Sequence, residues 1–327
     1  MLRRDFLRAA SATTLLSMMG GLSALAKGTS SEPYEISLSQ WSFHRAIFGN
    51  SREDYARFIA ALHSDPDSVL QGDLDPRDIV VRARELGVSH VDLVNILWFG
   101  HARDRAWLRD SSQRARDHDV TFVCLMCDEL GYLGSSDSEQ RRQAIENHKP
   151  WLACAAELGC TQVRVNAYGD GTYLEQLEQN AESMAALAEL AEDQGVELLV
   201  ENHGHPSSNA AWLAMLIEKV SHPNLGVYAD LDNFFMGGWN IVPERRYDRR
   251  QGLLDLAPYT RGVSAKTHAF TEDGQETTID YVTSMKVFAD HGFSGFASAE
   301  YEGNALSEYE GTQATIALLK ATRQQLG

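Results

Sequence analysis

Four residues whose side chains commonly bind cations stand at the ends of short apolar runs in the second half of the chain. Glu201, Asp230, His268 and Glu300 each close a run of about six mostly apolar residues. A carboxylate at the end of an apolar strand is costly to bury unless it is paired or bound to a cation. Three carboxylates and one imidazole suit a hard or borderline ion, so the pattern predicts a divalent metal site for Mn²⁺, Mg²⁺ or Co²⁺. Such an ion polarises bound oxygen atoms and acidifies a neighbouring C–H bond.

The elements that would position these side chains follow a repeated pattern. A helix rich in Ala, Leu and Glu ends at a glycine (Gly87, Gly159, Gly195, Gly292), and an apolar run and a polar residue follow. A glycine in that place is typical of a helix C-terminus. Eight runs have the length of buried parallel strands, at residues 36–42, 90–95, 120–127, 161–166, 196–202, 225–230, 262–268 and 295–301. Eight such units predict an α/β fold with a single (β/α)8 TIM barrel.

An open doubly wound sheet is the alternative fold. It is disfavoured because no Gly-x-Gly-x-x-Gly follows the first run, and no Pro, Gly or Ser-rich linker divides the chain. One domain over residues 27–327 is therefore expected. The long segment 44–76 and the segment 131–138 are expected to form an added loop or helix and a loop at the catalytic rim.

Polar and aromatic residues follow several of the runs, where the strands of such a barrel place their chemistry. Expected substrate contacts are Trp41, His44, Asp128, Arg164, Asn166 and His203. Arg164 fits equally well as part of an ion pair inside the barrel. Trp41, Trp98 and Phe99 offer rings that could stack on a sugar, although aromatic residues more often serve packing.

Several stretches resemble the sugar phosphate isomerase/epimerase family, which has a xylose isomerase-like barrel. They are Val200-Glu-Asn-His-Gly204, Leu225-Gly-Val-Tyr-Ala-Asp230, Ser264-Ala-Lys-Thr-His268, Gly292-Phe-Ser-Gly-Phe296 and Ala299-Glu-Tyr-Glu-Gly303, and the likeness runs from about residue 146 to the end. The resemblance implies that Glu201, Asp230, His268 and Glu300 bind a divalent metal. It also implies that Glu201 and Glu300 act as the acid and base.

Two departures from the family pattern affect this ligand set. The family histidine often lies two residues before the lysine of this strand, where this chain has Ser264. His268 instead lies two residues after Lys266, and His203 is a substitute candidate. Asp232 competes with Asp230, which is preferred because its spacing to the following asparagine matches the family.

The resemblance implies a metal-dependent sugar isomerase or epimerase that removes a proton next to a carbonyl and passes through an enediolate. Lys266 or Arg164 would stabilise the developing oxyanion. One alternative is a metal-dependent lyase or hydratase acting on keto-sugars or 3-keto-glycosides. Another is a non-catalytic sugar-binding barrel. The expected partner is a small carbohydrate, and a homo-oligomer is compatible with the sequence.

The first 26 residues have the composition of an export signal. Arg3 and Arg4 precede a short, mildly apolar stretch that ends in Ala24-Leu-Ala26, which resembles a twin-arginine signal peptide with a cleavage site. The expected partner is thus the twin-arginine translocase, and the expected location is periplasmic or otherwise extracytoplasmic, without a stable membrane anchor. The whole chain has a net charge of −17, and without this segment the charge is −19, because three Arg and one Asp are removed. That acidity works against a large nucleic-acid surface and disfavours an endonuclease-like function.

The four cysteines are expected to be free thiols. Cys124 and Cys127 form a Cys-x-x-Cys sequence, but on a strand an odd spacing directs their side chains to opposite faces. A zinc or redox pair is therefore disfavoured.

Overall fold

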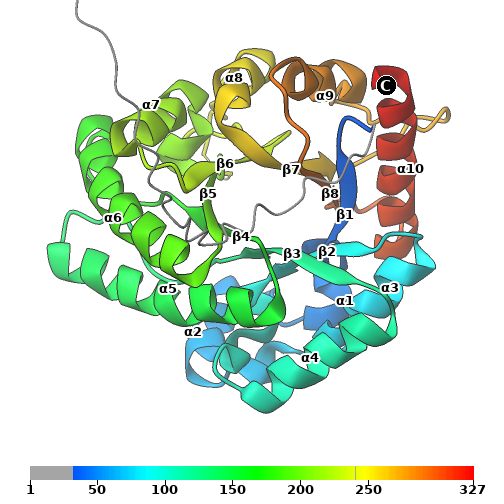
Figure 1. Cartoon of the computed structure of the whole chain (residues 1–327), viewed down its shortest axis with the longest axis horizontal. Helices are drawn as coiled ribbons and strands as arrows, with labels where there is room; N and C mark the ends of the chain where they lie inside the picture. Colours follow the sequence, from blue (N-terminus) through cyan, green and yellow to red (C-terminus); the bar gives the residue numbers. More distant parts are fainter. Residues whose placement is uncertain (1–31, 240) are drawn as a thin grey trace, which may run out of the picture. The chain divides into compact units, whose positions relative to one another are not determined.

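Eight parallel strands close into a barrel in the computed structural model, which describes residues 32–239 and 241–327 (Figure 1). Each strand pairs with the next in sequence, and β8 pairs with β1. The strands are β1 Glu35–Ser39, β2 His90–Val94, β3 Thr121–Met126, β4 Gln162–Asn166, β5 Glu197–Glu201, β6 Leu225–Asp230, β7 Thr260–Thr267 and β8 Phe296–Tyr301. The predicted (β/α)8 barrel is confirmed, and each of the eight expected runs overlaps one of these strands.

Helices surround the barrel on its outer side (Figure 1). They are α1 His44–Phe48, α2 Tyr55–Ser64, α3 Ile79–Glu85, α4 Arg105–Asp117, α5 Ser138–Leu158, α6 Tyr173–Gln194, α7 Ala210–Val220, α8 Arg249–Leu256, α9 Tyr281–Asp290 and α10 Glu308–Leu326. Local sequence fixes their ends: Thr172 and Glu175 form a capping box at the start of α6, and Gly195 ends it with φ +74°. The four predicted glycines all have positive φ.

The barrel interior contains a polar layer in addition to the expected aliphatic side chains. Asp92 on β2 is 1% exposed, and its carboxylate accepts hydrogen bonds from Ser37 Oγ at 3.1 Å and Tyr228 Oη at 2.8 Å. Burial raises the pKa of Asp92 above its ordinary value, and these hydrogen bonds offset only part of that rise. The interior is therefore specified by hydrogen bonding as well as by packing.

The predicted added segment, residues 44–76, contains α1, α2 and the 3-10 helix Pro66–Val69, so it is partly helical. Phe48 and Phe58 from this segment pack edge to face, with ring centres 5.0 Å apart, and belong to the hydrophobic core. All four cysteines are free and buried, as predicted.

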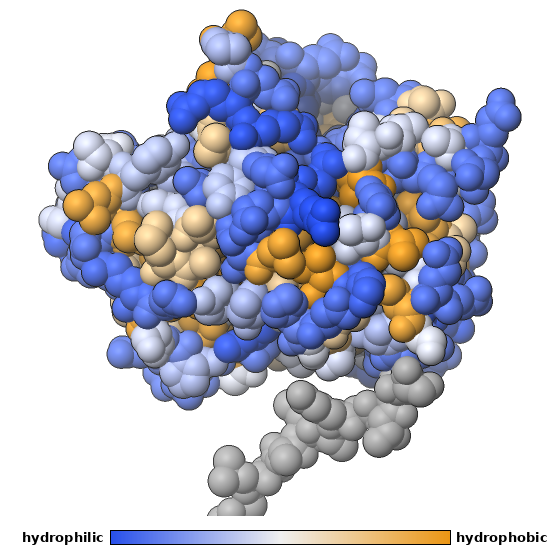
Figure 2. Space-filling model, turned by 90° about the horizontal axis from the view of Figure 1, so that it is seen from above, coloured by the Kyte–Doolittle hydropathy of each residue, from blue (hydrophilic) through white to orange (hydrophobic). Residues whose placement is uncertain are grey.

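Hydrophilic residues predominate on the face seen in Figure 2, and hydrophobic residues form scattered patches on it. Over the described ranges, none of the helices has both the length and the apolar character required to span a bilayer. The predicted signal segment 1–26 lies outside the described residues.

Candidate functional site

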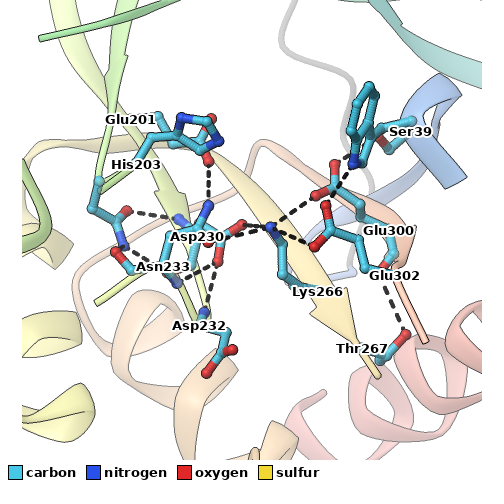
Figure 3. Close-up of polar contacts among 12 residues, drawn as sticks. Ser39, Glu201, His203, Asp230, Asp232, Asn233, Lys266, Thr267, Glu300 and Glu302 are labelled. Carbon is cyan, nitrogen blue, oxygen red and sulfur yellow. Dashed lines mark hydrogen bonds and ion pairs between the residues drawn. The ribbon is translucent and has the colours of Figure 1, made fainter. Parts of the chain in front are cut away.

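The carboxyl ends of the last four strands bring the predicted catalytic side chains together. Glu201 ends β5, Asp230 ends β6, and Lys266 and Glu300 lie one residue before the ends of β7 and β8. All four are buried, with exposures of 6% or less. Figure 3 shows Glu201 on one side of Asp230 and Lys266, with Glu300 on the other. The closed parallel barrel produces this cluster because it gathers all strand ends at one rim.

Lys266 lies at the centre of the carboxylates. Its Nζ is 3.2 Å from Asp230 Oδ2, 3.2 Å from Glu300 Oε1 and 3.5 Å from Glu302 Oε2, and it donates a hydrogen bond to Asn233 Oδ1 at 3.3 Å. Burial opposes the charged form of Lys266, but these carboxylates raise its pKa well above its usual range. The ammonium is therefore the central positive charge of the site.

Glu201 contacts a second cation. Glu201 Oε2 lies 2.7 Å from Arg164 Nε, and its Oε1 accepts a hydrogen bond from Asn233 Nδ2 at 3.0 Å. Arg164 also donates from Nη1 to Asp128 Oδ1 at 2.7 Å, so the ion pair considered for Arg164 is present. Burial raises the pKa of Glu201 to about 7 despite the opposing effect of Arg164. Glu201 is thus poised to exchange a proton near neutral pH.

Two residues at and just after the end of β1 hold Glu300 on β8 and Glu302 immediately after it. Ser39 Oγ donates to Glu300 Oε2 at 2.7 Å, and Trp41 Nε1 donates to Glu302 Oε1 at 2.5 Å. Burial raises the pKa of Glu300 to about 7, although Lys266 opposes the shift. Burial also tends to raise the pKa of Glu302, but Lys266 and other positive groups outweigh it and lower that pKa to about 2. Glu302 is therefore ionised at neutral pH, while Glu300 exchanges a proton there.

The structure does not bring His268 to the three predicted carboxylate ligands. His268 follows the last residue of β7, so strand parity no longer directs its side chain, which is 39% exposed. Its Nε2 lies 3.2 Å from Asp232 Oδ2, and Arg246 and Arg249 bind the other oxygen of Asp232. Asp232 is therefore held in a separate cluster, whereas Asp230 lies beside Lys266 at the strand ends.

The substitute histidine does not complete a metal site either. His203 Nδ1 lies 2.5 Å from Tyr168 Oη. Burial and, to a smaller extent, the positive charge of Arg164 lower the pKa of His203 to about 4. Within the described part of the chain, no group of three or more His, Cys, Asp or Glu side chains is arranged to hold a metal ion. The donors present do not fit the predicted four-ligand site, because the imidazole is missing and an ammonium stands among the carboxylates.

The other predicted substrate contacts lie around the same rim. Trp41 and His44 stack with ring centres 4.5 Å apart, and Asn166 Nδ2 donates to Asp128 Oδ1 at 2.6 Å. Trp98 is different, because it is fully buried against Trp107 and Trp151 and cannot stack on a ligand. Trp98 therefore serves packing rather than sugar stacking, the other role considered for it.

An aromatic cavity of about 440 Å³ adjoins the strand ends, and the sequence did not predict it. Its lining includes Asn166, Tyr55, Tyr132, Tyr168 and Trp239. Tyr132 is 50% exposed and Trp239 is 44% exposed. Gly204, at φ +67°, lets Trp239 approach, since a Cβ at this position would lie 2.9 Å from the indole ring. These rings come from segments far apart in the sequence, one of them helix α2, so no local spacing predicts the cavity.

Fold and site together define a TIM-barrel protein with a buried polar cluster at the carboxyl ends of its strands. The model of the xylose isomerase-like TIM barrel family matches residues 80–322, and the chain belongs to that family. A comparison with curated proteins gave no match.

Solved structures share this fold at low sequence identity. One is the 3-keto-D-glucoside 4-epimerase YcjR from E. coli, with 13% identity, a TM-score of 0.59, and coverage of 76% of this chain and 95% of that one. Another is the IolI protein with a bound zinc atom, with 15% identity, a TM-score of 0.60, and coverage of 76% and 94%. The probable 3-DHS dehydratase AsbF from Bacillus anthracis has 14% identity, a TM-score of 0.57, and coverage of 88% and 98%. At these identities the likeness is one of fold.

Proposed function

We propose that the protein is a sugar isomerase or epimerase that transfers a proton at a carbon next to a carbonyl. The observation that supports this most directly is the pair Glu201 and Glu300, which lie on opposite sides of Lys266 and both have a pKa near 7 (Figure 3). One carboxylate removes the proton from one face of the sugar carbon, and the other carboxylic acid returns a proton to the opposite face. The epimerase among the solved structures of the same fold is consistent with this chemistry.

Lys266 and Arg164 are the groups that stabilise the enediolate in this mechanism. Both cations are buried, so their attraction for a developing oxyanion is weakly screened by water. Lys266 is the better candidate, because Arg164 already contacts Asp128 and Glu201. The divalent metal predicted from the sequence has no step in this mechanism, since the donors do not form the predicted ligand set.

The proposed activity is tested by incubating the protein with keto-sugars, aldo-sugars and 3-keto-glycosides in D₂O. Isomerisation or epimerisation through an enediolate places solvent deuterium on the reacting carbon, which mass spectrometry and NMR detect. A non-catalytic sugar-binding barrel would bind a sugar without exchange. Failure of every sugar in the panel to exchange would contradict the proposal.

A lyase or hydratase is the second candidate, because the same proton abstraction leads to elimination when the neighbouring carbon bears a leaving group. Glu300, with its raised pKa, is suited to protonate that group. The dehydratase of the same fold is consistent with this alternative. The D₂O experiment separates the candidates, since elimination gives an unsaturated product and a released alcohol or water.

The activity is expected to have a bell-shaped pH dependence with its maximum near pH 7. At low pH both Glu201 and Glu300 are protonated and no base is available, whereas at high pH both are ionised and no acid is available. The two apparent pKa values belong to the interacting pair rather than to either residue. The measurement is kcat/KM between pH 5 and pH 9, and a flat profile would contradict the two-carboxyl mechanism.

We also propose that the aromatic cavity receives the part of the sugar or glycoside remote from the reacting carbon. Trp239→Ala is then expected to raise KM about tenfold, equivalent to roughly 1.4 kcal/mol, with little change in kcat. Steady-state kinetics on the best substrate provides the measurement. Met215→Ala is the control, because Met215 is similarly exposed but does not line the cavity. An equal loss of kcat in Trp239→Ala would assign the ring to the chemistry instead.

Export by the twin-arginine route remains a proposal from the sequence. Replacing Arg3 and Arg4 by Lys is expected to keep the protein in the cytoplasm, because the signal depends on both guanidinium groups. Cell fractionation measures this, and unchanged export of the double variant would contradict it.

A further inference from the structure

Ser264 stands at the position on strand seven where the resembled family often has its metal-binding histidine. Ser264 is 1% exposed and pairs in register with Asp230, so it lies inside the barrel beside a predicted ligand. Its Oγ has no hydrogen-bond partner among the described residues. A serine hydroxyl is shorter and less basic than an imidazole, so it does not replace the missing nitrogen ligand.

The two nearby histidines are engaged elsewhere. His268 contacts Asp232, which Arg246 and Arg249 also bind, and His203 contacts Tyr168. Moving either imidazole to the carboxylates would break these contacts. His268 would also leave Asp232, a carboxylate that is only 5% exposed, with one fewer partner.

Lys266 already supplies the positive charge that the buried carboxylates require. Its Nζ lies within 3.5 Å of Asp230, Glu300 and Glu302. A divalent ion binds carboxylate oxygens at about 2.0–2.6 Å and would need the space that this ammonium fills. Its charge would also add to that of Lys266, which favours exclusion of the ion.

We propose that the ammonium of Lys266 is the resident cation of this site and that the protein functions without a divalent metal. The position of Lys266 among three carboxylates, together with Ser264 at the histidine position, supports this. In the reaction, which rests on the proposed function, Lys266 donates a hydrogen bond to the substrate oxygen that becomes the oxyanion. The metal-free state itself is independent of which reaction occurs.

The test uses the purified full-length and signal-less proteins without added metal. Elemental analysis after gel filtration is expected to give far less than one equivalent of Mn, Co, Zn or Ni per chain. Millimolar Mg²⁺, Mn²⁺, Co²⁺ or Zn²⁺ is expected to leave the unfolding temperature unchanged, because a ligand that does not bind the native state does not stabilise it. EDTA is expected to leave turnover unchanged.

A metal that binds this site would overturn the proposal. The decisive result would be stoichiometric metal, or metal-dependent stabilisation, that is lost in Asp230→Asn; Glu300→Gln serves the same purpose if the first variant does not fold. Binding that persists in the variants lies elsewhere and leaves the proposal standing. Turnover that stops with EDTA and returns with Mn²⁺ would also overturn it. If no sugar reacts, the proposed function fails. If in the same experiments no metal binds, the proposal of a metal-free site still stands.

Discussion

Glu201→Gln is expected to lower kcat about 10³-fold, within the 10²–10⁴-fold range typical of a general acid or base. The amide keeps the size of the side chain and can still accept the hydrogen bond from Asn233. It cannot take a proton from carbon, so the chemical step is lost while the pocket is preserved. The measurements are kcat on the best sugar and deuterium incorporation from D₂O.

Glu197→Gln is the matched control, because Glu197 lies at the opposite end of the same strand. Its carboxylate pairs with Arg261 at 3.0 Å, outside the site, and this variant is expected to keep full activity. In Glu201→Gln, Arg164 keeps its contact with Asp128, so circular dichroism is expected to show a folded barrel. Near-normal turnover of a folded Glu201→Gln protein would refute the assignment of the base.

Lys266→Met is expected to lower kcat by about 10²–10³-fold with a smaller effect on KM, because one donor to the developing oxyanion is removed. It should also destabilise the fold, since breaking a buried ion pair commonly costs about 3–5 kcal/mol. Without the ammonium, the raised pKa of Glu300 rises further, and the lowered pKa of Glu302 moves back up. The stability loss should therefore shrink as the pH falls and these carboxyls take up protons.

The readouts are steady-state kinetics and urea unfolding at pH 5 and pH 8. Lys286→Met is the control, since Lys286 lies on α9 and pairs with Asp290 at an exposed position. It is expected to change neither kcat nor stability appreciably. A Lys266→Met protein with normal kcat would show that the ammonium is not involved in the reaction.

The fold was predictable because each unit repeats the same local signals. Glycines such as Gly159 and Gly195 adopt the left-handed backbone at helix ends, and the apolar runs after them are buried strands. The strand limits were less accurate. The first run was expected to reach residue 42, but β1 ends at Ser39 and the chain turns into a 3-10 helix over Gln40–Phe43.

The site was predictable only where a strand directs the side chain. Glu201, Asp230, Lys266 and Glu300 all lie on strands, and the structure brings them together. His268 lies one residue beyond its strand, where the contact with Asp232 determines its direction. Tyr132 and Trp239 depend on the paths of separate loops, which the sequence pattern does not specify.

The hydrogen bond from Ser39 to Glu300 joins residues 261 positions apart, and Trp41 holds Glu302 across the same separation. A chain emerging from the ribosome therefore holds the first half of this arrangement long before the second half exists. A product truncated before β8 would lack both carboxylates and also the strand that closes the barrel against β1. Synthesis of β8, closure of the barrel and acquisition of the reactive centre thus coincide.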